Sequence, residues 1–417
     1  MEASTAEDPI EQAELLLDEA RLRQEKLGDQ ARAASALDAA VERLRGLRGE
    51  HAERLRGRVE AIRTEMAPAT STVPAEPPTR ALETALARAR EALFDGEALV
   101  ELASAAGAAA RTASTEKASR LEVLARAASD LASFAAGDVP RARTPSAAVA
   151  VGRQARHAAA HPMVRSPLAR LLALLAPYLE RLFPADLSRC GVSGQHRLGT
   201  RRAPELLAVL EEAQRAMRTR AFAAFLSDTG GCEVAVENTQ PPSLVLGAGL
   251  ARSNEAERRF LLARGLALVD LGWALAGKFA PRDVAILCEL ACRFGGGAPA
   301  TAGLPAEQAR PFLEALERVV PPIVRERAVA LVPEATRDLA ALAPRELTAA
   351  LRQSASRLAL LHTGDLPSAL AGLVAGERRL QGLAREQVLA HPDVRDLAAF
   401  ALSRAYAALR AAAGRAA

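Results

Sequence analysis

The chain has 417 residues, of which 50% are hydrophobic, and a formal net charge of +4. A chain of this length can bury a sizeable core and is expected to divide into two or three domains. Only 3% of the residues are aromatic, and arginines alternate with acidic residues at helical spacing. This pattern argues against nucleic-acid binding, which uses basic patches and stacking platforms. Because Ala, Leu and Arg dominate and favour helix, we expect a mainly α protein.

Few cysteines and an acidic N-terminus indicate where the protein resides. The four cysteines are scattered along the chain, which argues against a disulfide framework and indicates a reducing compartment. The first residues are acidic and lack the apolar stretch of a signal peptide. The most apolar runs are too short for a membrane span or contain Asp270 and Lys278. We therefore expect a cytoplasmic protein with no membrane span.

Residues 1–66 are expected to form an N-terminal helical module. The pattern between 10 and 66 is helical, with one break at 26–30, and predicts an αα-hairpin or short coiled coil. Seven residues keep close to a heptad-like a/d spacing, six of them apolar: Leu37, Val41, Leu44, His51, Leu55, Val59 and Ile62. Such a hairpin buries little alone, so we expect it to contact protein partners or to self-associate. A Pro-rich linker follows at 67–79.

Beyond the linker, residues 80–164 are predicted to be helical and repeat-like in the manner of tetratricopeptides, although no 34-residue repeat is sustained. Residues 165–417 are expected to form a multi-helix domain. It has one small β-hairpin or sheet at about 232–247, where "CEVAVE" alternates and "SLVLGAG" is continuously apolar. A helix is expected before this pair, over 203–227. Further helices are expected after it at 254–279, 281–294, 305–332, 344–362, 366–376, 381–390 and 394–413.

Two stretches of this domain resemble a peptidase family. "SLVLGAGLARSNEAERRFLLARGLALV", residues 243–269, resembles the strand, turn and "LAHELGH" helix of the minimal HExxH zinc peptidases, or gluzincins, which include heat-shock and CAAX-type membrane peptidases. "ASRLALL", residues 355–361, is similar to the later family helix that carries the third zinc ligand. The C-terminal part is also similar to the C-terminal regions of myxobacterial tetratricopeptide-type proteins. The resemblance implies a metallopeptidase-like α-helical domain over 165–417.

The same resemblance implies that the zinc site is degenerate. In this register, Arg264 and Leu268 stand in place of the two histidines, and Gly265 stands in place of the general base. Arg352 stands in place of the third zinc ligand, and Ser356 in place of a supporting carboxylate. Zinc catalysis needs three protein ligands, a bound water and a base. An arginine keeps its proton, glycine carries no base and leucine has no lone pair. We therefore expect a pseudo-peptidase with no metal, no cofactor and no catalytic residue.

The expected function is that of a non-enzymatic interaction or scaffold protein that carries this degenerate domain. The alternative is a helical-repeat, tetratricopeptide-like scaffold without peptidase ancestry, which would have no strand pair at 232–247 packed beside the helix that follows. A third possibility is an enzyme that uses other polar residues, whose signature would be perturbed titration in a pocket.

Two further pairs have metal-ligand spacing. His157 and His161 stand one helical turn apart in "RHAAAHP", but Ala158 occupies the base position and Pro162 follows, so a surface pair at a helix end is expected. Cys288 and Cys292 are also one turn apart, with no third ligand nearby. Because cysteine is most often a small buried hydrophobe, we expect this pair to pack in the core.

Overall fold

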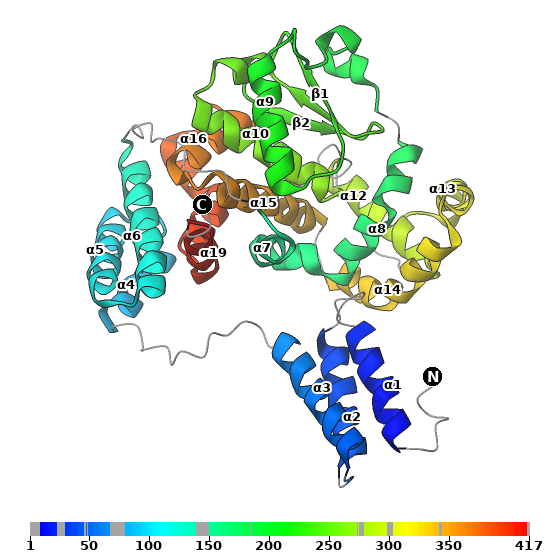
Figure 1. Ribbon diagram of the computed structural model, residues 1–417. Helices are drawn as coiled ribbons and strands as arrows, with labels where there is room; N and C mark the ends of the chain where they lie inside the picture. Colours follow the sequence, from blue (N-terminus) through cyan, green and yellow to red (C-terminus); the bar gives the residue numbers. More distant parts are fainter. Residues whose placement is uncertain are drawn as a thin grey trace. The chain divides into compact units, whose positions relative to one another are not determined.

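The structure is a computed structural model that describes residues 9–22, 30–45, 47, 49–66, 80–138, 150–183, 185–272, 274, 279–297, 303–341 and 344–414. The chain divides into two compact units, residues 1–77 and residues 78–417. Each unit is described by itself below. The expected linker at 67–79 and Trp273 lie outside the described residues. The expectation of a mainly α protein with a small sheet is confirmed (Figure 1).

In its described residues, the first unit has three helices where two were expected: α1 (Pro9–Leu22), α2 (Gln30–Leu44) and α3 (Glu50–Met66). The predicted long second helix is divided because Gly49 adopts φ +126°, a conformation that glycine reaches without strain. Five of the predicted a/d residues are buried in the core that joins the helices, and Val41 is partly buried against it; the five are Leu37, Leu44, Leu55, Val59 and Ile62. His51 is the exception, since it is exposed and contacts Glu14 of α1 at 3.1 Å.

A three-stranded sheet lies in the second unit. The expected pair is confirmed as β2 (Val234–Glu237) and β3 (Ser243–Leu246), which are antiparallel. The structure adds β1 (Ala223–Leu226), parallel to β3, and the strand order is β1-β3-β2. The helix expected over 203–227 was therefore too long. It forms α9 (Pro204–Met217) and ends where Arg218 turns into the left-handed region at φ 48°.

Helix α10 (Glu255–Asp270) is the centre of this unit. The side chain of Asn254 accepts a hydrogen bond from the Glu257 N–H at 2.8 Å and caps the first turn. Every residue from Phe260 to Ala267 is buried. The helix packs against α9, strand β2, α15 (Pro344–Thr363) and α16 (Leu366–Gly376) (Figure 1). A sheet packed beside this helix is the feature that the repeat-scaffold alternative did not predict.

The remaining helices complete two apolar clusters. The larger cluster contains residues of α4, α5 and α6 together with residues of α10, α15, α16, α18 and α19. Buried contacts therefore cross the domain boundary expected near residue 164. The smaller one joins α8 with α12 to α15. The bounds are α4 Arg80–Glu91, α5 Gly96–Thr112, α6 Thr115–Ala136, α7 Arg153–Ala159, α8 Pro167–Leu182, α12 Pro281–Phe294, α13 Ala306–Val319, α14 Pro322–Ala341, α17 Arg385–Ala390, α18 Pro392–Ala401 and α19 Arg404–Gly414.

Two of the predicted helices are each divided in two. The helix expected over 305–332 breaks at Val320, which is extended because Pro321 follows it and disfavours helical geometry there. The helix expected over 394–413 breaks after Ala401, and Ser403 accepts a hydrogen bond from the Tyr406 N–H at 3.0 Å at the start of the next helix.

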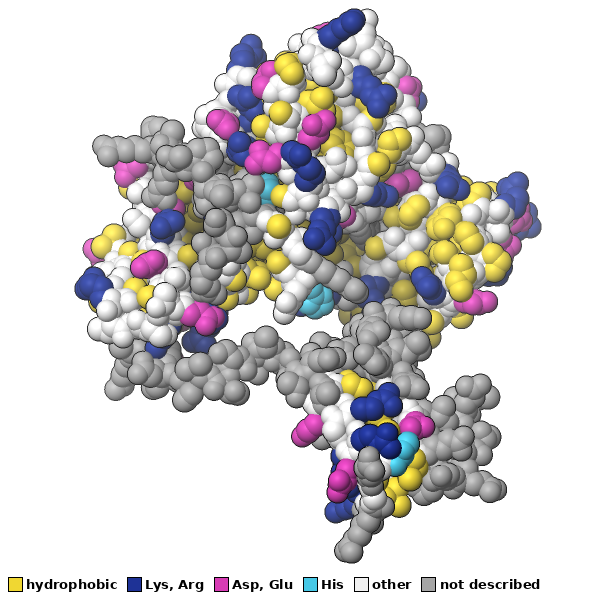
Figure 2. All heavy atoms as spheres, in the orientation of Figure 1, with side chains coloured by type: hydrophobic (Ala, Val, Ile, Leu, Met, Phe, Trp, Pro, Cys, Tyr) yellow, Lys and Arg dark blue, Asp and Glu magenta, His cyan; other side chains and the backbone are white. Residues whose placement is uncertain are grey.

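The surface seen in Figure 2 carries both signs of charge in an interspersed pattern, and hydrophobic side chains gather over α12 to α14. On α14, Ile323 and Val329 are 59% and 48% exposed. Within the described ranges, no helix is both long and apolar enough to cross a bilayer.

Candidate functional site

The strongest candidate for a functional site is the group of charged side chains around Arg264 on α10. Its guanidinium is buried, and Nε donates a hydrogen bond to Ser356 Oγ on α15 at 3.0 Å. A terminal nitrogen of the same guanidinium donates to the carboxylate of Glu377, which follows α16. Ser356 Oγ in turn donates to the carbonyl oxygen of Arg352 at 3.0 Å. Arg264 therefore joins three segments that are distant in the sequence.

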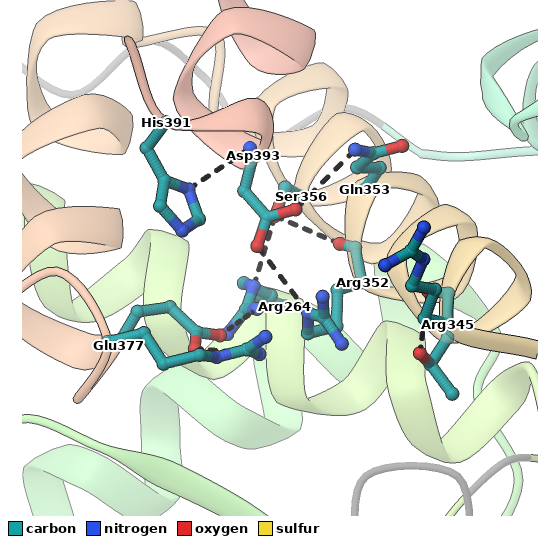
Figure 3. Close-up of polar contacts among 10 residues, drawn as sticks. Arg264, Arg345, Arg352, Gln353, Ser356, Glu377, His391 and Asp393 are labelled. Atoms are coloured by element: carbon teal, nitrogen blue, oxygen red, sulfur yellow. Dashed lines mark hydrogen bonds and ion pairs between the residues drawn. The ribbon is translucent and has the colours of Figure 1, made fainter. Parts of the chain in front are cut away.

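A second ion pair continues the group. Arg352 Nε donates to Asp393 Oδ2 at 3.4 Å, and Asp393 is 4% exposed in the first turn of α18. Arg379 lies 3.6 Å from the other oxygen of Glu377. Figure 3 shows the side chains of Arg264, Arg352, Ser356, Glu377 and Asp393 directed toward one another, whereas Arg345 lies apart from them. We call this group the ion-pair cluster; its members are Arg264, Arg352, Ser356, Glu377, Arg379 and Asp393.

Burial and charge act in opposite directions on the titration of the cluster. Burial raises the pKa of Glu377. The charge and hydrogen bond of Arg264, together with the charges of Arg379 and Arg352, lower this pKa by more and hold it below its usual value. Burial lowers the pKa of Arg352, and Asp393 opposes this shift. A guanidinium remains protonated under such a shift. The arginines of the cluster therefore favour the ionised form of Glu377 in spite of its burial.

The structure brings some of the sequence-predicted positions together. Arg264 and Ser356 are in direct contact, and Arg352 stands one turn before Ser356 on the same helix. Gly265 faces the sheet instead, because a Cβ at this position would lie 2.6 Å from Val234 Cγ1. Leu268 is partly buried and packs against the larger apolar cluster. The position to which the resemblance assigned the general base therefore faces β2.

The residues at these positions do not fit a zinc ion. Arginine, glycine and leucine offer no ligand, and the serine hydroxyl is held by Arg264 and the Arg352 carbonyl. Among the described residues, no group of three His, Cys, Asp or Glu side chains is placed to hold a metal. What the arrangement can do chemically is hold buried charges of both signs in fixed positions.

Sequence reasoning missed Glu377 and Asp393. A signal for them did exist, because Arg264 interrupts an otherwise apolar stretch, and a buried guanidinium requires a carboxylate partner. That signal does not say which carboxylate is used. Glu377 is 113 residues and Asp393 is 129 residues further along the chain, and neither belongs to a local motif.

The histidine pair of the sequence analysis lies at the end of helix α7. Helix α7 ends at Ala159, so His161 lies beyond it, and its Nδ1 accepts a hydrogen bond from the Met163 N–H at 3.3 Å. His157 Nε2 lies 3.4 Å from Arg165. The two histidines are therefore not presented on one helix face.

The two cysteines of α12 are buried, as expected for core packing. Burial raises the pKa of the Cys288 thiol to about 12 and that of the Cys292 thiol to about 11. Both groups therefore stay protonated near neutral pH, the form that is a poor nucleophile and a poor metal ligand.

Comparison with known proteins adds no assignment. The chain matches no family model, no curated protein and no solved structure.

Proposed function

We propose that this chain is a non-catalytic interaction protein whose larger unit carries a degenerate metallopeptidase-like domain. The ion-pair cluster stands in this domain where a zinc peptidase would hold its metal. The observation that supports the proposal most strongly is the contact between Arg264 and Ser356. In zinc sites a ligating histidine is held by a second group, often a carboxylate. Here Arg264, in place of the first histidine, donates a hydrogen bond to Ser356, in place of the supporting carboxylate, at 3.0 Å.

The chemistry of the cluster supports a structural role. Each carboxylate in it is close to a guanidinium, and the side chains of Arg264 and Glu377 are only 7% and 15% exposed. Buried charges of this kind are stable when they are paired and unstable when one partner is removed. The cluster would then connect α10 and α15 to the segments that follow α16 and begin α18.

Partner binding is assigned in this proposal to the N-terminal unit. Its three helices enclose a small apolar core of their own and expose mixed charge, as Arg45 with Glu42 illustrates at 3.3 Å. We infer that these helices bind protein partners or mediate self-association. We also infer a cytoplasmic setting, in which the four free cysteines stay reduced. The face seen in Figure 2 carries interspersed charges of both signs, whereas nucleic-acid binding uses a broad basic surface.

The alternative, a helical-repeat scaffold without peptidase ancestry, is favoured by the antiparallel packing of α4, α5 and α6. The mixed sheet and its contact with α10 weigh against it. We therefore retain the metallopeptidase-like proposal as the leading one.

Metal analysis of the purified full-length protein tests the proposal. The protein is incubated with zinc, dialysed and analysed for bound metal, and its hydrolysis of an unstructured protein substrate is assayed in parallel. We expect far less than one zinc per chain and no hydrolysis above a buffer control. Stoichiometric zinc that a chelator removes together with a hydrolytic activity would contradict the proposal.

A further inference from the structure

Helix α14 has two regular faces. One face packs in the smaller apolar cluster through Ala328, Val332, Ala335 and Leu339. On the opposite face, exposed residues recur at alternating spacings of three and four, which is the a/d spacing of a coiled-coil seam. We call this row the α14 stripe; its members are Ile323, Glu326, Ala330, Pro333, Arg337 and Ala340. All six are exposed, so the stripe is a seam without a second helix in the described part of the chain.

The two charged residues of the stripe have no ion-pair partner among the described residues. Glu326 contacts no described cation. Arg337 Nε donates to a carbonyl oxygen of its own helix at 3.5 Å, and no described carboxylate pairs with the guanidinium. Elsewhere on this helix an exposed charge is paired, since Arg325 lies 3.1 Å from Glu317 of α13. The stripe therefore offers one charge of each sign to an incoming surface.

A second α14 in the antiparallel direction is complementary to the stripe. In an antiparallel pair, each a residue faces a d residue of the other helix. If the two-fold axis passes between positions 331 and 332, Glu326 faces Arg337 of the second copy. Ala330 then faces Pro333, and Ile323 faces Ala340. A parallel pair would instead place each charge opposite its own kind, which is destabilising.

The charges beside the stripe obey the same symmetry. Arg327 and Glu334 each follow a d residue of the stripe, which is the e position of a heptad. In the antiparallel pair, Arg327 of one copy lies beside Glu334 of the other. Both are exposed, and neither has an ion-pair partner among the residues that the structure describes. Because a two-fold interface repeats every contact, each of the two kinds of ion pair forms twice.

The apolar residues of the stripe suit a close but weak contact. Ala330 and Pro333 are small at the centre, and Ile323, which is 59% exposed, lies near each end. A helix of 20 residues is about 30 Å long, so one pair of such helices makes an interface at the small end of the known range.

We propose that two copies of this chain associate through their α14 stripes in an antiparallel pair. This contact is separate from the N-terminal helices. It does not depend on the proposed function, because no residue of the stripe belongs to the ion-pair cluster.

Sedimentation equilibrium of the full-length protein tests whether the dimer forms. We expect a reversible dimer with a Kd of roughly 1–100 μM, as is typical of a small interface. A natural protein that remains monomeric at about 200 μM, well above that Kd, would overturn the proposal.

Charge reversal tests which surface is used. Glu326→Arg and Arg337→Glu are each expected to raise the Kd at least about tenfold, because each places like charges opposite one another twice. The double variant restores opposite charges in the reversed sense, and its Kd should lie within about threefold of the natural value.

Two more variants complete the comparison, and circular dichroism verifies the fold of each protein. Arg327→Glu, which reverses a flanking charge, should also weaken the dimer. Glu211→Arg is the matched control, because it makes the same change at an exposed position of α9 and should leave the Kd unchanged. If the single reversals on α14 leave the Kd unchanged, or if the double variant does not restore it, the copies associate through another surface and the proposal is wrong.

Discussion

At the scale of single residues, Arg264 is the most informative position in the chain. It lies in a helix whose other residues from Phe260 to Ala267 are apolar and buried or are glycine. A guanidinium tolerates this environment only because Ser356 and Glu377 satisfy it. The resemblance read from the sequence listed positions 264 and 356 as parts of one site, and their side chains are in contact in the structure. It was not sufficient to identify Glu377, since the fold alone brings that residue back to α10.

Replacing Arg264 is expected to be costly. Arg264→Met leaves Glu377 buried beside a weaker partner, and we expect a loss of about 3 kcal/mol in the free energy of unfolding, measured in urea. Arg88→Met is the matched control. Its pair with Glu101 is about half exposed, so we expect a loss below about 1 kcal/mol. Equal losses in the two variants would show that the cluster has no special role.

The second residue-scale prediction concerns pH. Burial raises the pKa of Glu377, but its arginine neighbours lower it by more, so the pKa in the folded state is below the ordinary 4.5. A carboxylate with a depressed folded pKa contributes stability above its unfolded pKa, and that contribution is lost as pH falls through the folded value. As the pH is lowered below 4.5, the urea concentration at the unfolding midpoint should therefore decrease. The decrease should be steeper in the natural protein than in Glu377→Gln. Parallel curves for the two proteins would contradict this.

At the scale of elements, the contact between α10 and the sheet depends on a missing side chain. Gly265 allows the helix to approach β2, and any Cβ there would press on Val234 and Leu244. The sequence predicted the helix and two strands, because their hydrophobic periodicity is local. It missed β1, since "AFAAFL" is compatible with both helix and strand. Only the parallel pairing of Phe225 with Val245 decides between them.

A pair of glycine variants tests this contact. Gly265→Ala should destabilise the protein by about 1–3 kcal/mol, because the added methyl overpacks the helix–sheet interface. Gly107→Ala on α5 has open space around the new Cβ and is expected to stabilise the protein by about 0.4–1 kcal/mol. Thermal unfolding of both variants gives the comparison. Stabilisation by Gly265→Ala would mean that α10 does not approach the sheet this closely.

At the scale of the whole molecule, the chain forms two compact units with separate cores. The N-terminal helices could be predicted because their heptad-like spacing is local. The extent of the second unit could not, because its larger cluster combines α4 to α6 with helices more than two hundred residues later. Such contacts leave no mark in local periodicity.

A fragment of residues 1–77 is expected to fold on its own, since its buried residues pack only against one another in the described core. Circular dichroism should show helix and a cooperative urea transition of a few kcal/mol, as is typical of small domains. Leu17→Asn, which places an amide in that core, should abolish the transition. A fragment that is unfolded in buffer would contradict the assignment of an independent unit.

The central claim, that the ion-pair cluster stands where a zinc peptidase holds its metal, is tested most directly by restoring the ligands. A full-length variant with Arg264→His, Leu268→His and Arg352→Glu would carry two imidazoles one turn apart and a facing carboxylate. A control variant moves both histidines one residue back, as Ala263→His and Ala267→His with Arg352→Glu. Bound zinc is measured after dialysis, with circular dichroism to verify the fold. We predict one zinc per chain in the first variant and none in the natural protein or the control; a folded first variant that binds no zinc would contradict the claim.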